Sequence, residues 1–117
     1  MQLNEIVFQD AAPIDGYGPG FFRVGGQVAH GDVLLQAERC TPWGGYSDAQ
    51  SPLELKAHID VLFVGTGKDT ARVPAEFRHA LEQAGIGVEA MSTPAACRTY
   101  NVLLSEGRRV AAALLAV

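Results

Sequence analysis

The chain has 117 residues, of which 48% are hydrophobic and 19% charged, and its formal net charge is −4. This length suits a single domain spanning residues 1–117, and the apolar content argues against disorder. A net negative charge excludes nucleic acid as a general partner, because contacts to phosphates need a basic face. Two cysteines without a CxxC motif do not make a disulfide framework, so Cys40 and Cys97 are expected to be free thiols.

The first third of the chain predicts short strands joined by tight turns. Residues 15–20 form a dense turn signal of Gly and Pro, and Gly25-Gly26 suits a two-residue hairpin loop. The last three of these strands are expected to form an antiparallel meander. The expected strands are Leu3–Phe8, Phe21–Val24, Gln27–His30 and Val33–Ala37.

The middle of the chain predicts little regular structure. Pro42 and Gly44-Gly45 indicate that Cys40–Tyr46 is irregular. Ser51-Pro52 could open a short helix, with Ser51 as N-cap and Pro52 at the first helical position.

The second half alternates between strand and helix patterns. Glycines follow both helices, and Thr93 is the expected N-cap of the second. The alternation implies parallel strands with right-handed crossovers, and the meander adds antiparallel ones. We therefore predict an α/β fold with a mixed sheet and helices on one face. The expected elements are the strand Ile59–Val64, the helix Pro74–Ala84, the strand Gly87–Met91, the helix Thr93–Glu106 and the strand Arg109–Ala116.

The segment Gly65-Thr66-Gly67-Lys68 directly follows the apolar strand, where phosphate-binding loops occur. It fits neither the Walker A pattern nor the GxGxxG fingerprint. One interpretation is a strand exit that needs the conformational freedom of glycine. The alternative is a loop that contacts a ligand or partner, because ligands bind beyond the carboxyl ends of parallel strands.

The helix start Thr93–Arg98 is the second candidate site. A helix N-terminus offers unpaired N–H groups, and Arg98 in the first turn could help to hold an anion. The same field would lower the pKa of an exposed Cys97 thiol. Cys97 shares a helical stripe with Tyr100 and Leu104, which instead favours a buried thiol.

Other motifs are less informative. Trp43, between Pro42 and Gly44, is either a partner anchor or a lid on the domain's own core. The three histidines have no metal-ligand spacing and no nucleophile or carboxylate at a telling distance. We therefore assign no catalytic residue, metal or cofactor.

Essentially the whole chain, and most sharply residues 59–115, resembles a known family of small domains. The residues that carry the resemblance are Gly65, Thr66, Gly67, Met91, Thr93, Ala96, Cys97, Thr99, Tyr100, Asn101, Glu106, Gly107 and Arg108. They resemble the uncharacterised-domain family that includes the mitochondrial complex I (NADH:ubiquinone oxidoreductase) assembly factor, the adipogenesis-associated protein and bacterial and archaeal relatives. The resemblance implies one three-layer domain: a mixed sheet, a small extra β layer, and helices on the other face. It implies an assembly role for the mitochondrial member and no reaction, substrate or cofactor.

These observations favour a non-enzymatic binding or assembly module over an enzyme. Its protein partner, at a membrane complex, would contact Trp43, the Gly65–Lys68 loop and the Thr93–Arg98 helix start. The alternative is a small-ligand binder or enzyme that uses a pocket at Gly65–Lys68 and Thr93–Arg98, and a third is self-association. The N-terminus has no signal-peptide pattern and the longest apolar run is too short to span a bilayer, so we expect a cytoplasmic protein without a transmembrane segment.

Overall fold

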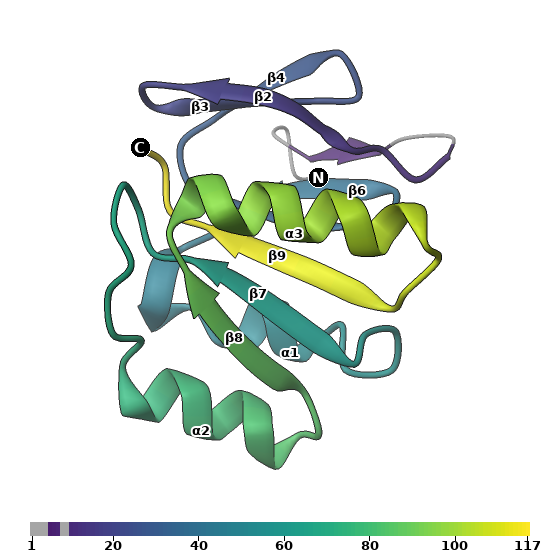
Figure 1. Ribbon diagram of the computed structural model, residues 1–117. Helices are drawn as coiled ribbons and strands as arrows, with labels where there is room; N and C mark the ends of the chain where they lie inside the picture. Colours follow the sequence, from purple (N-terminus) through teal and green to yellow (C-terminus); the bar gives the residue numbers. More distant parts are fainter. Residues whose placement is uncertain (1–4, 8–9) are drawn as a thin grey trace.

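The computed structural model describes residues 5–7 and 10–117, which form two β-sheets, three α-helices and one 3₁₀ turn (Figure 1). The strands are β1 (Ile6–Val7), β2 (Ile14–Gly18), β3 (Phe21–Val24), β4 (Gln27–His30), β5 (Val33–Gln36), β6 (Arg39–Pro42), β7 (Val61–Gly65), β8 (Gly87–Met91) and β9 (Val110–Leu114). The helical elements are η1 (Gly45–Ser47), α1 (Gln50–Leu53), α2 (Ala75–Gln83) and α3 (Thr93–Ser105).

The large sheet is mixed, with strand order β1-β6-β5-β9-β7-β8. Its β7, β8 and β9 are parallel, as the strand–helix alternation predicts, while β5 runs antiparallel to β9 and β6. All five residues of β9 are buried. Such strands are apolar throughout because both of their faces are covered.

The longer helices cover opposite faces of this sheet (Figure 1). Alternate residues of β9 enter different cores: Ala112 packs in the cluster that contains Tyr100 of α3, and Ala113 packs in the cluster that contains Phe77 of α2. The chain moves from β7 outward to β8 through α2, and then back past β7 to β9 through α3. Right-handed crossovers that run in opposite directions place their helices on opposite faces. The expected α/β class with a three-layer arrangement and a small extra β layer is confirmed, whereas the expectation of helices on one face is wrong.

The small sheet has the order β2-β3-β4 and shares its face of the large sheet with α3. The hairpin around Gly25-Gly26 is confirmed, since both glycines have positive φ and Val24 pairs with Gln27. The third strand of the meander is not Val33–Gln36, which joins the large sheet. It is β2, in the segment that its glycines and proline marked as a turn.

Three further local predictions need correction. Cys40–Tyr46 is not irregular throughout, because Cys40 pairs with Leu35 in β5 and Pro42 lies at the very end of β6. The N-cap of α3 is Ser92, whose side chain accepts a hydrogen bond from Ala95 N; Thr93 lies inside the helix. Similarly, α1 begins after Ala49, so Ser51 is not its N-cap. Of the expected strand Leu3–Phe8, Ile6–Val7 is confirmed and residues 3, 4 and 8 lie outside the described residues.

Candidate functional site

The candidate residues gather at one end of the large sheet. The pairing register places Pro42, Val33, Leu114, Gly65 and Met91 side by side across five adjacent strands. The segments that follow β6, β7 and β8 therefore leave the sheet at the same end of its strands. The carboxyl ends of the parallel strands lie at this end, where α/β proteins commonly bind ligands.

The loop leaving β7 lies directly against the start of α3. Thr66 N donates to Met91 O at 2.8 Å, and Thr93 N donates to Gly67 O at 2.7 Å. In return, Gly67 N donates to Thr93 Oγ1 at 2.9 Å. The hydroxyl of Thr93, a fully buried residue, also donates to Leu115 O at 2.7 Å. These reciprocal bonds join β7, α3 and the end of β9 into one junction.

The two glycines of this loop have different structural roles. A Cβ at Gly65 would lie 2.8 Å from Thr93 Oγ1 and 2.9 Å from Leu114 Cδ2, so the helix can approach this closely only because the side chain is absent. Gly67 has a φ of 102°, a conformation that favours glycine. Both observations agree with the interpretation of this segment as a tightly packed strand exit.

The amide positions in the first turn of α3 are already occupied. Thr93 N bonds Gly67 O, and Pro94 carries no N–H. The N–H groups of Ala95 and Ala96 donate to Oγ and O of Ser92, at 3.4 and 2.9 Å. An anion at this helix start would have to displace one of these bonds, although Arg98 and Lys68 are exposed on the two adjoining segments.

Cys97 points into the core. The residue is 4% exposed and packs in the cluster that contains Tyr100 and Cys40. Burial raises the pKa of the Cys97 thiol to about 11, and the charge of Arg98 offsets only part of that effect. Because the thiolate is the reactive form, a thiol with this pKa is a poor nucleophile at neutral pH. This agrees with the interpretation of Cys97 as a packing residue.

Trp43 reaches the same end of the sheet but lies on its other face. Its ring is 4% exposed and packs against Tyr46 and Phe77, with centroid distances of 5.7 Å to each. Its Nε1 donates to Asp48 O at 3.0 Å. The cluster around Trp43 includes α2 residues, whereas the cluster around Cys97 lies under α3. The Trp43 ring therefore covers the core that contains Phe77, and the sheet separates this ring from Thr93 and Cys97.

Sequence reasoning missed Asp48, which organises the segment between β6 and α1. Its carboxylate accepts hydrogen bonds from Gly44 N, Ser51 N and Ser51 Oγ. Burial opposes ionisation of this carboxyl, but the bonds from Ser51 and Gly44 outweigh that effect and lower its pKa. The spacing Asp48-x-x-Ser51, typical of a side chain that caps a following turn, could have indicated this role.

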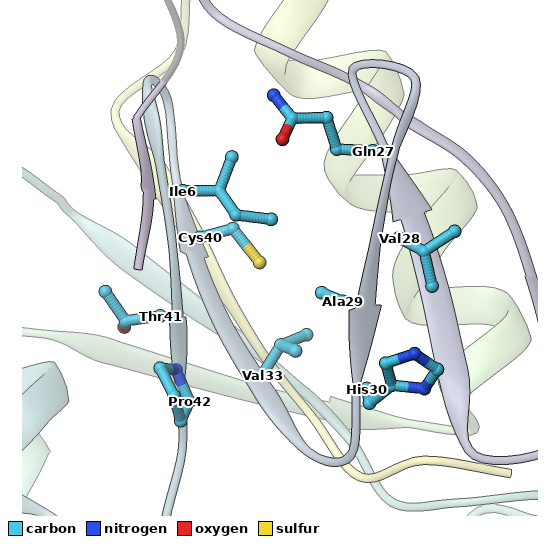
Figure 2. A pocket seen from close by; sticks show the side chains of 9 residues that line it. All are labelled: Ile6, Gln27, Val28, Ala29, His30, Val33, Cys40, Thr41 and Pro42. Atoms are coloured by element: carbon cyan, nitrogen blue, oxygen red, sulfur yellow. The ribbon is translucent and has the colours of Figure 1, made fainter. Parts of the chain in front are cut away.

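A slot between the two sheets was also missed (Figure 2). It has a volume of about 330 Å³ and is lined by residues of β1, β4, β5 and β6. Ile6, Val33 and Cys40 point into it from the large sheet. No local sequence pattern predicts this slot, because its walls come from strands of both sheets. Burial raises the pKa of Cys40 to about 11.

No group of three His, Cys, Asp or Glu residues within 5–7 and 10–117 is placed to hold a metal ion. Over the same part of the chain, no helix has the length and apolar character needed to cross a membrane.

The chain folds as an α/β domain with a six-stranded mixed sheet, a second small sheet and helices on both faces of the large sheet. The end of β7 and the start of α3 form one junction in this domain. The chain belongs to the family described as "Protein of unknown function (DUF498/DUF598)", whose model matches residues 14–115. This agrees with the family resemblance stated from the sequence.

Three related proteins illustrate the range of this similarity. An uncharacterised protein of Rhodobacter capsulatus is 51% identical over 98% of this chain and 93% of its own length. The NADH dehydrogenase [ubiquinone] 1 alpha subcomplex assembly factor 3 of Rattus norvegicus is 34% identical over 98% of this chain. The chain spans 66% of the length of that factor. The crystal structure of an outer membrane protein from Bartonella henselae has a TM-score of 0.84 and 40% identity, covering 94% of this chain and 98% of its own.

Proposed function

We propose that this chain is a non-enzymatic binding or assembly module that binds a protein partner at a membrane complex. The observation that carries the proposal is the 34% identity, over 98% of this chain, to a rat protein named as a complex I assembly factor. The buried Cys97 thiol supports the non-enzymatic part, because its pKa of about 11 leaves little thiolate to act as a nucleophile.

We place the partner-binding face at the end of the sheet, over the junction of the β7 exit and the α3 start. Lys68 and Arg98 are exposed on the two segments that meet there. The reciprocal bonds between Gly67 and Thr93 hold these segments in a fixed relation. A rigid platform with two cationic side chains, on a chain with net charge −4, suits an acidic surface of a partner. The buried Trp43 contributes to this face indirectly, because it packs in the core on the opposite side of the same sheet.

The second candidate function is a small-ligand binder or enzyme at Gly65–Lys68 and Thr93–Arg98. Its support is the position of these segments beyond the carboxyl ends of parallel strands. Either Cys97 or Arg98 would contact an anionic or electrophilic ligand, and contact through Cys97 requires that residue to become accessible. Alkylation of Cys97 by iodoacetamide at pH 6, much faster than alkylation of glutathione, would favour it over the assembly role.

Rescue of complex I assembly tests the leading proposal. Rat cells depleted of assembly factor 3 would receive a chimera in which this chain replaces the matched segment of the factor. We expect the chimera to restore assembled complex I on native gels. Lys68→Glu with Arg98→Glu should reduce this rescue, whereas Arg23→Glu, a charge reversal on exposed β3, should not.

The possible failures of this experiment are distinguishable. A chimera that accumulates normally in mitochondria but restores no complex I would contradict the assembly role. Full rescue by the Lys68→Glu and Arg98→Glu variant would retain the assembly role and reject the face that we assign to it.

A further inference from the structure

The outer edge of β4 carries backbone groups that bond no residue within 5–7 and 10–117. Val24 pairs with Gln27 across the two-residue loop, and Gly31 N donates to Gly20 O at 2.8 Å at the other end of the hairpin. Hydrogen-bonded positions alternate along an antiparallel pair. The N–H and C=O groups of Val28 and His30 therefore point away from β3, and no hydrogen bond to them is found among the described residues.

Val28, Ala29 and His30 of β4 form part of the wall of the slot, and the side chain of Ala29 points into it (Figure 2). Figure 2 shows the side chains of Val28 and His30 directed away from it, although both residues form part of its wall. They therefore contribute mainly main-chain atoms. The opposite wall and the floor are largely apolar, with Ile6 from β1, Val33 from β5 and Cys40 from β6. A row of main-chain donors and acceptors above an apolar floor is the arrangement that binds an added strand.

Two other sheet edges in the described part of the chain are blocked at one residue each. At β8, Arg78 Nη1 donates to Val88 O at 2.9 Å, so a guanidinium occupies part of that edge. At β2, Asn101 bonds both N and O of Ile14 at 2.8 Å. Natural proteins block exposed edges in these ways to prevent unwanted pairing. Among the described residues, nothing of this kind covers the edge of β4, and the strand contains no Asp, Glu, Lys or Arg.

The geometry favours a single extended segment over a second copy of the chain. Strands β1 and β6 of the large sheet lie across the slot from β4, because Ile6 and Cys40 point into it from the opposite side. A second copy that paired through β4 would bring its own large sheet against these strands. A four-residue strand also offers far less than the roughly 1,200–2,000 Å² that stable interfaces between folded proteins bury. A single extended segment carries no second sheet, so it can pair with β4 without such a contact.

We infer that β4 binds an extended, uncharged segment of a partner protein, which adds to the small sheet as a fourth strand and directs alternate apolar side chains into the slot above Cys40. None of the residues that line the slot is Asp, Glu, Lys or Arg, so a charged side chain would enter it unpaired. This surface differs from the face at the end of the large sheet, so each of the two assignments can fail without the other.

Peptide selection on the folded full chain tests this inference. The probe is a library of random heptapeptides displayed on phage, followed by synthetic copies of the enriched peptides. We expect enriched peptides to alternate apolar residues, to carry no charge at the inward positions, and to shift the amide resonances of Val28 and His30. N-methylation of alternate peptide residues should weaken binding roughly tenfold for each hydrogen bond lost.

A matched pair of variants locates the bound strand. Val28→Pro removes one outward N–H without breaking a bond to β3, and should weaken binding by roughly tenfold. Val28→Thr keeps the N–H and should bind like the parent chain. Absence of enriched peptides, insensitivity to N-methylation, or resonance shifts confined to other surfaces would overturn the inference. Because N-methylation changes only the peptide, this result stands even if Val28→Pro does not fold.

Discussion

The side-chain amide of Asn101 in α3 hydrogen-bonds both backbone groups of Ile14 in β2: Ile14 N donates to Oδ1, and Nδ2 donates to Ile14 O, each at 2.8 Å. The amide thus takes the place of a neighbouring strand at the edge of the small sheet. Through this pair of bonds, α3 holds the small sheet to the rest of the domain.

Replacing Asn101 should loosen this attachment. Asn101→Ala leaves two part-buried backbone groups of Ile14 without partners, and we expect a loss of about 2 kcal/mol in the free energy of unfolding. Urea denaturation measures this change. Ser105→Ala on the exposed side of the same helix is the control, with an expected change under about 0.5 kcal/mol. Equal effects of the two substitutions would contradict the role assigned to Asn101.

Gly65 should tolerate no side chain. Gly65→Ala places a Cβ within 3.0 Å of both Thr93 and Leu114, and overpacking of this kind should cost about 2 kcal/mol. The matched control is Gly16→Ala, where a Cβ meets nothing within 4 Å. Thermal melts compare the two variants with the parent chain. A Gly65→Ala protein as stable as Gly16→Ala would mean that α3 does not approach β7 this closely.

Tyr100 should be a major contributor to the core beneath α3. Tyr100 is fully buried, and its hydroxyl accepts a hydrogen bond from Ala37 N at 3.1 Å. Tyr100→Ala should destabilise the fold by about 3–5 kcal/mol, as large-to-small aromatic changes do. Tyr100→Phe, which removes only the hydroxyl, should cost about 1 kcal/mol. A chemical melt in which Tyr100→Ala costs less than about 1 kcal/mol would show that this helix face is not packed as described.

The two buried thiols should make the protein less stable above pH 9. Burial raises the pKa of both Cys40 and Cys97 from 9.0 to about 11. As the pH rises, the thiols of the unfolded chain lose their protons first. This ionisation lowers the free energy of the unfolded state more than that of the folded state, so it favours unfolding. The contribution of the protonated thiols to the stability of the folded state is complete below pH 9 and is lost as the pH rises toward 11.

Urea midpoints at pH 7, 9 and 10 measure this dependence. The double variant Cys40→Ala with Cys97→Ala removes both titrating groups, so its stability should fall less steeply between pH 9 and 10. Parallel curves for the parent and the variant would exclude the thiols as the cause. The raised pKa of Tyr100, from 10.0 to about 12, acts in the same direction at higher pH and is common to both proteins.

Local patterns predicted those parts of the structure that neighbouring residues determine. Gly25-Gly26 identified the β3–β4 hairpin to the residue, because only positive φ values close a two-residue loop of this kind. The apolar spacing and the following glycines located α2 and α3 to within about two residues. By contrast, β2 and β6 were missed, because their glycines and prolines suggest turns while pairing with β3 and β5 makes them strands.

For the candidate site, the sequence indicated the residues and the structure decided their environments. Gly65, Thr66, Gly67 and Thr93 meet as the alternation of strands and helices implies. Trp43 was equally compatible with an anchor and a lid, and only packing against Tyr46 and Phe77 makes it a lid. The slot beside β4 and the edge positions blocked by Arg78 and Asn101 depend on segments distant in the chain, so no local pattern predicts them.

By itself, then, the sequence determined the α/β class, the hairpin, the two long helices and the inward stripe that carries Cys97 and Tyr100. These features follow from backbone preferences and apolar spacing within a few residues. Tertiary structure alone decided that the helices lie on opposite faces, that Trp43 and Cys97 belong to separate cores, and where sheet edges are blocked. The physical reason is that strand order, set by burial and long-range hydrogen bonding, fixes which face each crossover covers and which edge remains unpaired.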